Sequence, residues 1–125
     1  MDQDVCIIEA TPTTPYVSCD TAERSIKIRG RAIPENSTEF FHPVRCWIDA
    51  YKKLNLPLRI DFQFEYFNTA VLKNVVKLLK SLEELYSAGT EVTINWYYET
   101  DDEDMLDEGQ NLADIVKIPI HLIQG

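Results

Sequence analysis

The chain lacks the features that would place it in a membrane, outside the cell or around a structural metal. None of its apolar runs approaches the roughly 20 residues that a membrane-spanning helix needs. Residues 1–10 carry neither the positive segment nor the apolar core of a secretory signal. Its cysteines, Cys6, Cys19 and Cys46, are odd in number, far apart in the sequence and without a CxxC pair, which disfavours a disulfide framework or a zinc site. We therefore expect one domain over residues 1–125, located in the cytoplasm, with no membrane partner.

Positive charge is almost missing from the last third of the chain. Residues 81–125 contain one Lys or Arg and 11 Asp or Glu, whereas residues 1–80 contain 11 and 10, respectively. The formal net charge of −9 therefore arises in the C-terminal third. A surface of that sign repels phosphate backbones and argues against nucleic acid as the partner. It suits a basic protein partner, and it equally suits plain solubility.

The spacing of apolar residues predicts an α/β fold. Residues 58–66 and 91–98 alternate apolar and polar side chains, as strands with one buried face do. A three- and four-residue apolar spacing, typical of amphipathic helices, runs from about residue 38 or 43 to residue 54 and again over residues 71–86. The stripes that we expect to be buried are Phe40, Val44, Trp47, Ile48 and Tyr51 in the first helix and Leu72, Val75, Val76, Leu79, Leu82 and Tyr86 in the second. We therefore expect a mixed β-sheet with helices mainly on one face.

Weaker signals complete the predicted order of elements. Further strands are expected at residues 5–9, 16–19, 25–29 and 116–122, the second and third joined as a hairpin. Pro and Asn interrupt residues 30–37, which predicts a loop. The acidic stretch after residue 98 is expected to be partly helical over residues 105–113.

The junction between the strand at residues 58–66 and the helix at residues 71–86 places a hydroxyl at a strand-to-helix switch. Asn68 and Thr69 lie where the first backbone N–H groups of the helix lack partners and the helix dipole is positive. A phosphate on the Thr69 hydroxyl would meet these donors and a favourable field. From spacing alone, a plain N-cap at either residue, worth about 1 kcal/mol, is the default interpretation, and capping does not exclude phosphorylation.

The acidic segment at residues 99–104 invites a metal-site interpretation that its spacing does not support. An EF-hand loop starting at Asp102 would find Asp104 at a ligand position, but Leu106 occupies the fifth position. A solvated loop or a partner-binding surface is the better interpretation, with no metal. Its acidic residues are Glu99, Asp101, Asp102, Glu103 and Asp104.

One further cluster would suit nucleophilic chemistry. His42, Cys46 and Asp49 share the polar side of the first predicted helix, where a thiolate–imidazole pair could form. Nothing in the sequence supplies an oxyanion hole or a positioned third group. We therefore expect neither catalysis nor a cofactor.

Four short motifs follow one another in a specific order. They are Gly-Arg-Ala-Ile-Pro-Glu-Asn at 30–36, Phe-Phe-His-Pro at 40–43, Tyr-Phe-Asn-Thr at 66–69, and Trp-Tyr-Tyr-Glu at 96–99 running into acidic residues. In their order and spacing, from about residue 8 to residue 118, the chain resembles the SiaC family of bacterial regulatory phosphoproteins.

The resemblance implies a STAS-like fold, similar to the anti-sigma-factor antagonists, and reversible phosphorylation at Thr69. It also implies a GHKL-type protein kinase, a PP2C-like phosphatase, and an unmodified form that binds and activates a diguanylate cyclase. Glu35, Asn36 and Asn68 would then shape the loops around Thr69, and the acidic segment would form part of the docking surface. We predict a non-catalytic partner-switching protein; the alternatives are a metal- or small-ligand-binding protein or enzyme, and a constitutive adaptor.

Overall fold

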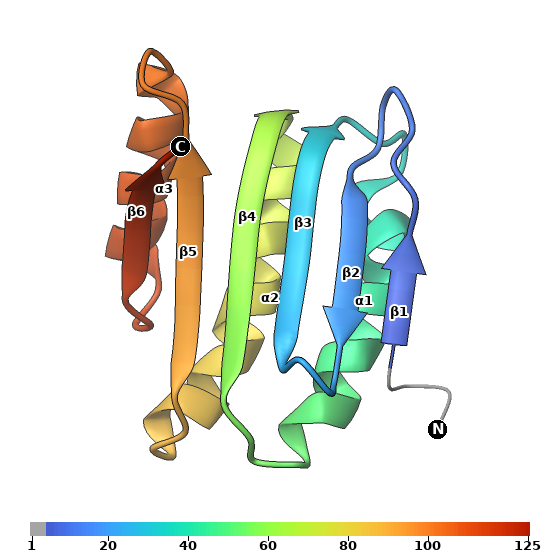
Figure 1. The fold of residues 1–125 in the computed structure, drawn as a ribbon, viewed down its shortest axis with the longest axis vertical. Helices are drawn as coiled ribbons and strands as arrows, with labels where there is room; N and C mark the ends of the chain where they lie inside the picture. Colours follow the sequence, from blue (N-terminus) through green and yellow to red (C-terminus); the bar gives the residue numbers. More distant parts are fainter. Residues whose placement is uncertain (1–4) are drawn as a thin grey trace.

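Six strands form one mixed sheet, and the helices cover a single face of it (Figure 1). The computed structural model describes residues 5–125. Residues 1–4, which belong to the segment expected to lack a secretory signal, lie outside the described residues. The strands are β1 (Val5–Ile8), β2 (Tyr16–Asp20), β3 (Ser25–Ala32), β4 (Leu58–Phe67), β5 (Val92–Tyr98) and β6 (Ile120–Gln124). The helices are α1 (Ser37–Lys52), α2 (Thr69–Ser87) and α3 (Glu103–Ile115).

The topology brings the starts of the helices to one edge of the sheet. The strands lie in chain order; β1, β2 and β3 pair antiparallel, and β3, β4, β5 and β6 pair parallel. Each parallel crossover runs through one helix, as parallel pairing requires. The carboxyl ends of β3, β4 and β5 therefore lie beside the amino ends of α1, α2 and α3 (Figure 1). This confirms the predicted mixed sheet with helices on one face.

The two helix stripes differ in detail from the prediction. In α1, Phe41 is fully buried, while Phe40 is only partly buried against the core. In α2, the buried set is Val71, Asn74, Val75, Leu78, Leu79, Leu82 and Leu85, and Leu72, Val76 and Tyr86 are partly buried. The stripe is displaced because α2 packs closely against α1, where Arg45 bonds Asn74 across the helix pair. The side of α2 that carries Leu72 is left more open, toward α3.

Three predicted boundaries were wrong. Strand β3 continues to Ala32 instead of ending in a loop, because a bulge between Gly30 and Arg31 restores its pairing with β4. Gly30 has a φ of 111°, a conformation that strains any side chain. The last strand begins at Ile120 instead of residue 116, although Val116 and Ile118 are buried, and α3 is longer than expected at both ends.

Helices α2 and α3 are tied together at their carboxyl ends. The Lys80 ammonium donates to the Ile115 carbonyl at 2.9 Å, and Glu83 accepts from the Lys117 backbone N–H at 2.7 Å. That N–H, helped by the nearby Lys80, holds the pKa of Glu83 below its usual value, although partial desolvation acts in the opposite direction. These contacts fix one end of the α2–α3 pair while the other end flanks the candidate site.

Gly109 allows α3 to lie directly on the sheet. A Cβ at this position would come within 2.5 Å of Trp96 Cδ1 and 2.6 Å of Leu122 Cδ2, both side chains packed in or against the core. Alanine normally stabilises a helix interior by about 1 kcal/mol relative to glycine. Here we expect Gly109→Ala to lower the free energy of unfolding, measured by urea denaturation, by about 1–3 kcal/mol because of overpacking.

The exposed neighbour Gln110 provides the control for this substitution. Gln110→Ala should change the free energy of unfolding by no more than about 0.5 kcal/mol. An increase in stability for Gly109→Ala would contradict the close contact between α3 and Trp96.

Candidate functional site

The amino end of each helix is capped by one of the residues predicted to lie at the site. Asn36 Oδ1 accepts from the Glu39 N–H at 3.1 Å, Asn68 Oδ1 from Val71 at 2.9 Å, and Asp102 Oδ1 from Met105 at 3.0 Å. The three caps lie along the carboxyl edge of the parallel strands. This edge is where open α/β sheets place their ligands.

Thr69 is the first residue of α2 and does not cap it. Asn68 precedes the helix with extended backbone (φ −97°, ψ 174°), which is the conformation of an N-cap, and its side chain takes the first free N–H. Of the two residues left open as caps, Asn68 therefore has that role. The Thr69 side chain is exposed and is left free for another role.

A groove of about 370 Å³ lies between the start of α2 and the start of α3. It is lined by Glu65, Tyr66, Phe67, Asn68, Thr69, Leu72, Asp102, Asp104, Met105 and Glu108. Four of these side chains are carboxylates, and no Lys or Arg is among them. We call this the Thr69 groove. Its apolar floor and acidic rim suit a protein partner that presents both apolar and basic groups.

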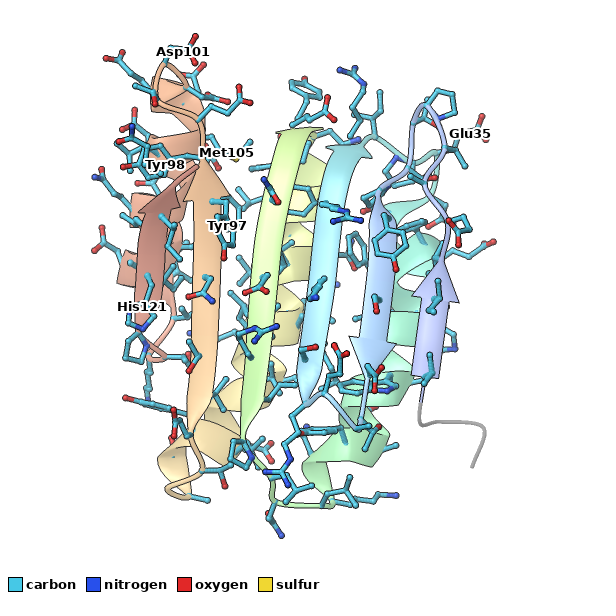
Figure 2. The ribbon with its side chains drawn as sticks, viewed as in Figure 1. Glu35, Tyr97, Tyr98, Asp101, Met105 and His121 are labelled. Atoms are coloured by element: carbon cyan, nitrogen blue, oxygen red, sulfur yellow. The ribbon has the colours of Figure 1, made fainter. Side chains whose placement is uncertain are left out.

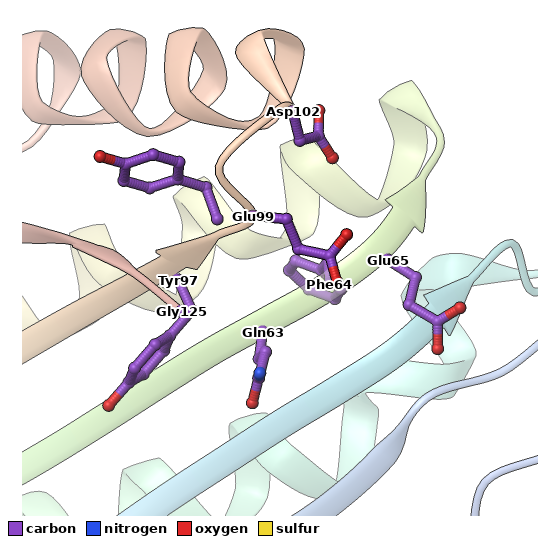
Figure 3. A pocket seen from close by; sticks show the side chains of 8 residues that line it. Gln63, Phe64, Glu65, Tyr97, Glu99, Asp102 and Gly125 are labelled. Carbon is purple, nitrogen blue, oxygen red and sulfur yellow. The ribbon is translucent and has the colours of Figure 1, made fainter.

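A second recess of about 300 Å³ adjoins the Thr69 groove on the other side of Asp102 (Figure 3). The two share Glu65 and Asp102, and Glu99 projects into the second recess together with Gln63 and Tyr97. Gly125 lies here as well, because its N–H donates to the Tyr98 carbonyl at 3.0 Å. The carboxyl ends of β4 and β5 thus carry one continuous acidic surface.

One positive charge lies at the border of this acidic surface. The Arg31 guanidinium is 5.7 Å from the centre of the Tyr66 ring, which lines the Thr69 groove and is 52% exposed. Within residues 5–125, no three His, Cys, Asp or Glu side chains come close enough together to hold a metal ion.

The structure brings some predicted site residues together and separates others. Asn68, Thr69, Asp102 and Asp104 line the Thr69 groove, and Glu99 lines the adjoining recess. Asp101 and Glu103 line neither hollow, and Asp101 lies at the tip of the β5–α3 loop (Figure 2). Asn36 caps the start of α1. Glu35 directly precedes it and lies on the same edge but beyond β3 (Figure 2).

Sequence reasoning assigned four of the ten groove residues to the site and missed the other six, among them Glu65, Met105 and Glu108. Glu65 belongs to the polar face of the alternating strand at residues 58–66, and it is the last carboxylate on that face before β4 ends. Met105 and Glu108 come from the first turns of α3, and Glu108 lies one turn after Asp104 on the same face. The four-residue spacing of Asp104 and Glu108 places both carboxylates on one side of a helix, so the sequence contained a signal for Glu108 once a helix was expected there.

The His42–Cys46 pair forms as the spacing suggested. Cys46 Sγ lies 3.4 Å from His42 Nε2, and both side chains are exposed on α1. They line a small hollow of about 140 Å³ between α1 and α2, which shares no residue with the Thr69 groove. The exposure of Cys46 agrees with its predicted place on the polar side of this helix.

Comparison with known proteins identifies the family to which this chain belongs. Residues 8–125 match the model of the SiaC family regulatory phosphoproteins. The chain belongs to the SiaC family. The predicted family and fold class are thereby confirmed.

Relatives of this SiaC-family chain cover almost all of its length. An uncharacterized protein of Pseudomonas aeruginosa (strain UCBPP-PA14) is 27% identical over 113 residues, covering 90% of each chain. The crystal structure of the diguanylate cyclase SiaD with its activator SiaC, from Pseudomonas aeruginosa, matches with a TM-score of 0.91 and 26% identity, over 96% of this chain and 99% of that one. The crystal structure of apo-SiaC matches with a TM-score of 0.88 and 26% identity, over 95% and 98% of the two chains.

Among residues 5–125, none of the helices has both the length and the apolar character needed to cross a bilayer.

Proposed function

We propose that this SiaC-family protein is a non-catalytic regulator that binds and activates a diguanylate cyclase while Thr69 is unmodified. A GHKL-type protein kinase adds a phosphate to Thr69, and a PP2C-like phosphatase removes it. Because the kinase consumes ATP, we propose that the cycle operates in the cytoplasm. The similarity to SiaC, the activator of SiaD, supports the cyclase as the partner class.

The observation that carries this proposal is the position of Thr69. It is exposed at the first position of α2 and lines the Thr69 groove, so a kinase can reach it and a bound partner would cover it. The backbone N–H groups of a first helical turn and the positive end of the dipole favour a phosphate at this point. Asn68 holds the turn in place by capping the helix.

The phosphate would act on the binding surface and leave the fold intact. It adds about −1.5 to −2 charges. These charges would join the carboxylates of Glu65, Asp102 and Asp104 around the same groove. A partner that fits a neutral hydroxyl would then have to desolvate an additional anion. The local structure would change little, whereas the affinity for the partner would fall strongly.

The remaining predicted contact residues extend the docking surface along the same edge. Glu99 contributes through the adjoining recess, and Asp101 and Glu103 through the exposed loop before α3. Glu35 and Asn36 would extend it to the start of α1, where both side chains are exposed. We propose all five as secondary contacts around Thr69.

Phosphosite mapping tests the proposal. The purified protein is incubated with ATP and the GHKL-type kinase of the same organism, and the sites are mapped by mass spectrometry. We expect phosphate on Thr69 and loss of incorporation in Thr69→Ala.

Ser37 supplies a matched control. It is the first residue of α1 and follows the Asn36 cap, as Thr69 follows Asn68, but it is only 6% exposed. Ser37→Ala should leave incorporation unchanged. Phosphate on another residue, or full incorporation in Thr69→Ala, would overturn the assignment.

A further inference from the structure

Strand pairing places two cysteines directly opposite each other. In the antiparallel register of β1 and β2, Cys6 pairs with Cys19. Opposed residues of antiparallel strands carry their side chains on the same face. Here that face is the one covered by helices, since Cys19 is fully buried and Cys6 packs against the core while partly exposed. Cys6 and Cys19 are far apart in the sequence, and the pairing of β1 with β2 brings them together.

The backbone spacing of such a pair suits a disulfide bond. Directly opposed residues have Cα atoms about 4.5–5.5 Å apart, within the roughly 4.4–6.8 Å span of disulfides. The two thiols also lie close enough for each to influence the pKa of the other. A backbone shift that brings the two sulfur atoms to bonding distance costs little, because β1 is an edge strand of four residues that pairs with β2 alone.

We propose that Cys6 and Cys19 form a reversible intramolecular disulfide by exchange with a low-molecular-weight disulfide of the glutathione type. The Cys6 thiolate attacks one sulfur of glutathione disulfide, which forms a mixed disulfide and releases one glutathione thiolate. Cys19 then gives its proton to solvent and attacks the Cys6 sulfur, which releases the second glutathione thiolate. Both thiolates take up protons, so the two cysteines are oxidised by two electrons and glutathione disulfide is reduced to two glutathione molecules.

The order of attack follows from burial. Cys6 is partly exposed and can meet the reagent, whereas Cys19 is enclosed. Desolvation raises the pKa of both thiols, and most strongly that of Cys19. Cys19 therefore reacts second, with the mixed disulfide between Cys6 and glutathione. That disulfide is already held beside Cys19, so proximity compensates for the small fraction of Cys19 that is thiolate.

The bond would fasten the outer strand of the sheet. It closes the loop between Cys6 and Cys19, which reduces the conformational entropy of the unfolded chain. It also keeps β1 in place over the edge of β2, which would otherwise be open to pairing with another chain. This pair lies at the β1 side of the sheet, whereas the Thr69 groove lies between β4 and α3. Oxidation should therefore leave Thr69 phosphorylation unchanged, so this inference and the proposed function can fail independently.

The experiment uses the Cys46→Ser variant, in which only the paired thiols remain. The folded protein is incubated with glutathione disulfide, and free thiols, intact mass and linked peptides are then measured. We expect both thiols to be lost, the mass to fall by two hydrogen atoms, and a Cys6–Cys19 peptide to appear. The melting temperature should rise by roughly 5–10 °C and return after reduction with dithiothreitol.

A second substitution provides the control. Adding Cys6→Ser, or Cys6→Ala if the serine variant is unstable, should abolish both the linked peptide and the rise in melting temperature. The proposal would be overturned by two free thiols after prolonged incubation, by a stable glutathione adduct without the cross-link, or by a disulfide that joins two chains.

Discussion

The Thr69→Asp variant should bind the diguanylate cyclase of the same organism about 100-fold more weakly than Thr69→Asn. The two side chains have nearly the same size, so the comparison isolates one negative charge. Placing like charges together in an interface costs several kcal/mol, and 1.4 kcal/mol corresponds to a factor of ten. The groove already carries the carboxylates of Glu65, Asp102, Asp104 and Glu108, and the Arg31 guanidinium lies near its Tyr66 ring.

The fold should tolerate the aspartate, which makes the result interpretable. An acidic residue at the first helical position interacts favourably with the helix dipole, by about 0.3–1 kcal/mol. The melting temperature of Thr69→Asp should therefore equal or exceed that of Thr69→Asn. Affinities can be measured by isothermal titration calorimetry, with cyclase activity as a second readout. Equal binding by both variants would exclude charge as the basis of the switch and favour a constitutive adaptor.

Replacing Trp96 by alanine should lower the free energy of unfolding by about 3–5 kcal/mol. The Trp96 ring is 1% exposed, and its centroid lies 5.6 Å from Phe62, 5.9 Å from Phe64 and 6.0 Å from Phe67. Its indole N–H donates to the Met105 carbonyl at 2.9 Å. The side chain therefore joins β4 and β5 to the first turns of α3. Its removal would leave a cavity and a buried carbonyl without its partner.

Trp96→Phe separates these two effects. It keeps most of the aromatic contact with Phe62 and Phe64 but loses the bond to Met105, so we expect a smaller cost of about 1–3 kcal/mol. Urea denaturation of the three proteins gives the comparison. A loss below about 1 kcal/mol for the alanine variant would show that α3 does not depend on this contact.

The sequence by itself determined the elements and the family of this protein. Strict alternation over residues 58–66 predicted β4 and its buried face, because side-chain direction repeats every two residues in a strand. The apolar spacing of residues 71–86 predicted α2 in the same way, since neighbours along the chain report local geometry. The order of four motifs, including the one that ends in Thr69, indicated the SiaC family.

Only the tertiary structure decided which side chains meet. Glu65 and Glu108 join Thr69 because parallel crossovers bring three helix starts to one edge, a relation that no local pattern contains. Cys6 and Cys19 face each other because strand register pairs residues that are distant in the chain. Local periodicity specifies how a segment folds, whereas contacts between segments depend on the packing of the whole sheet.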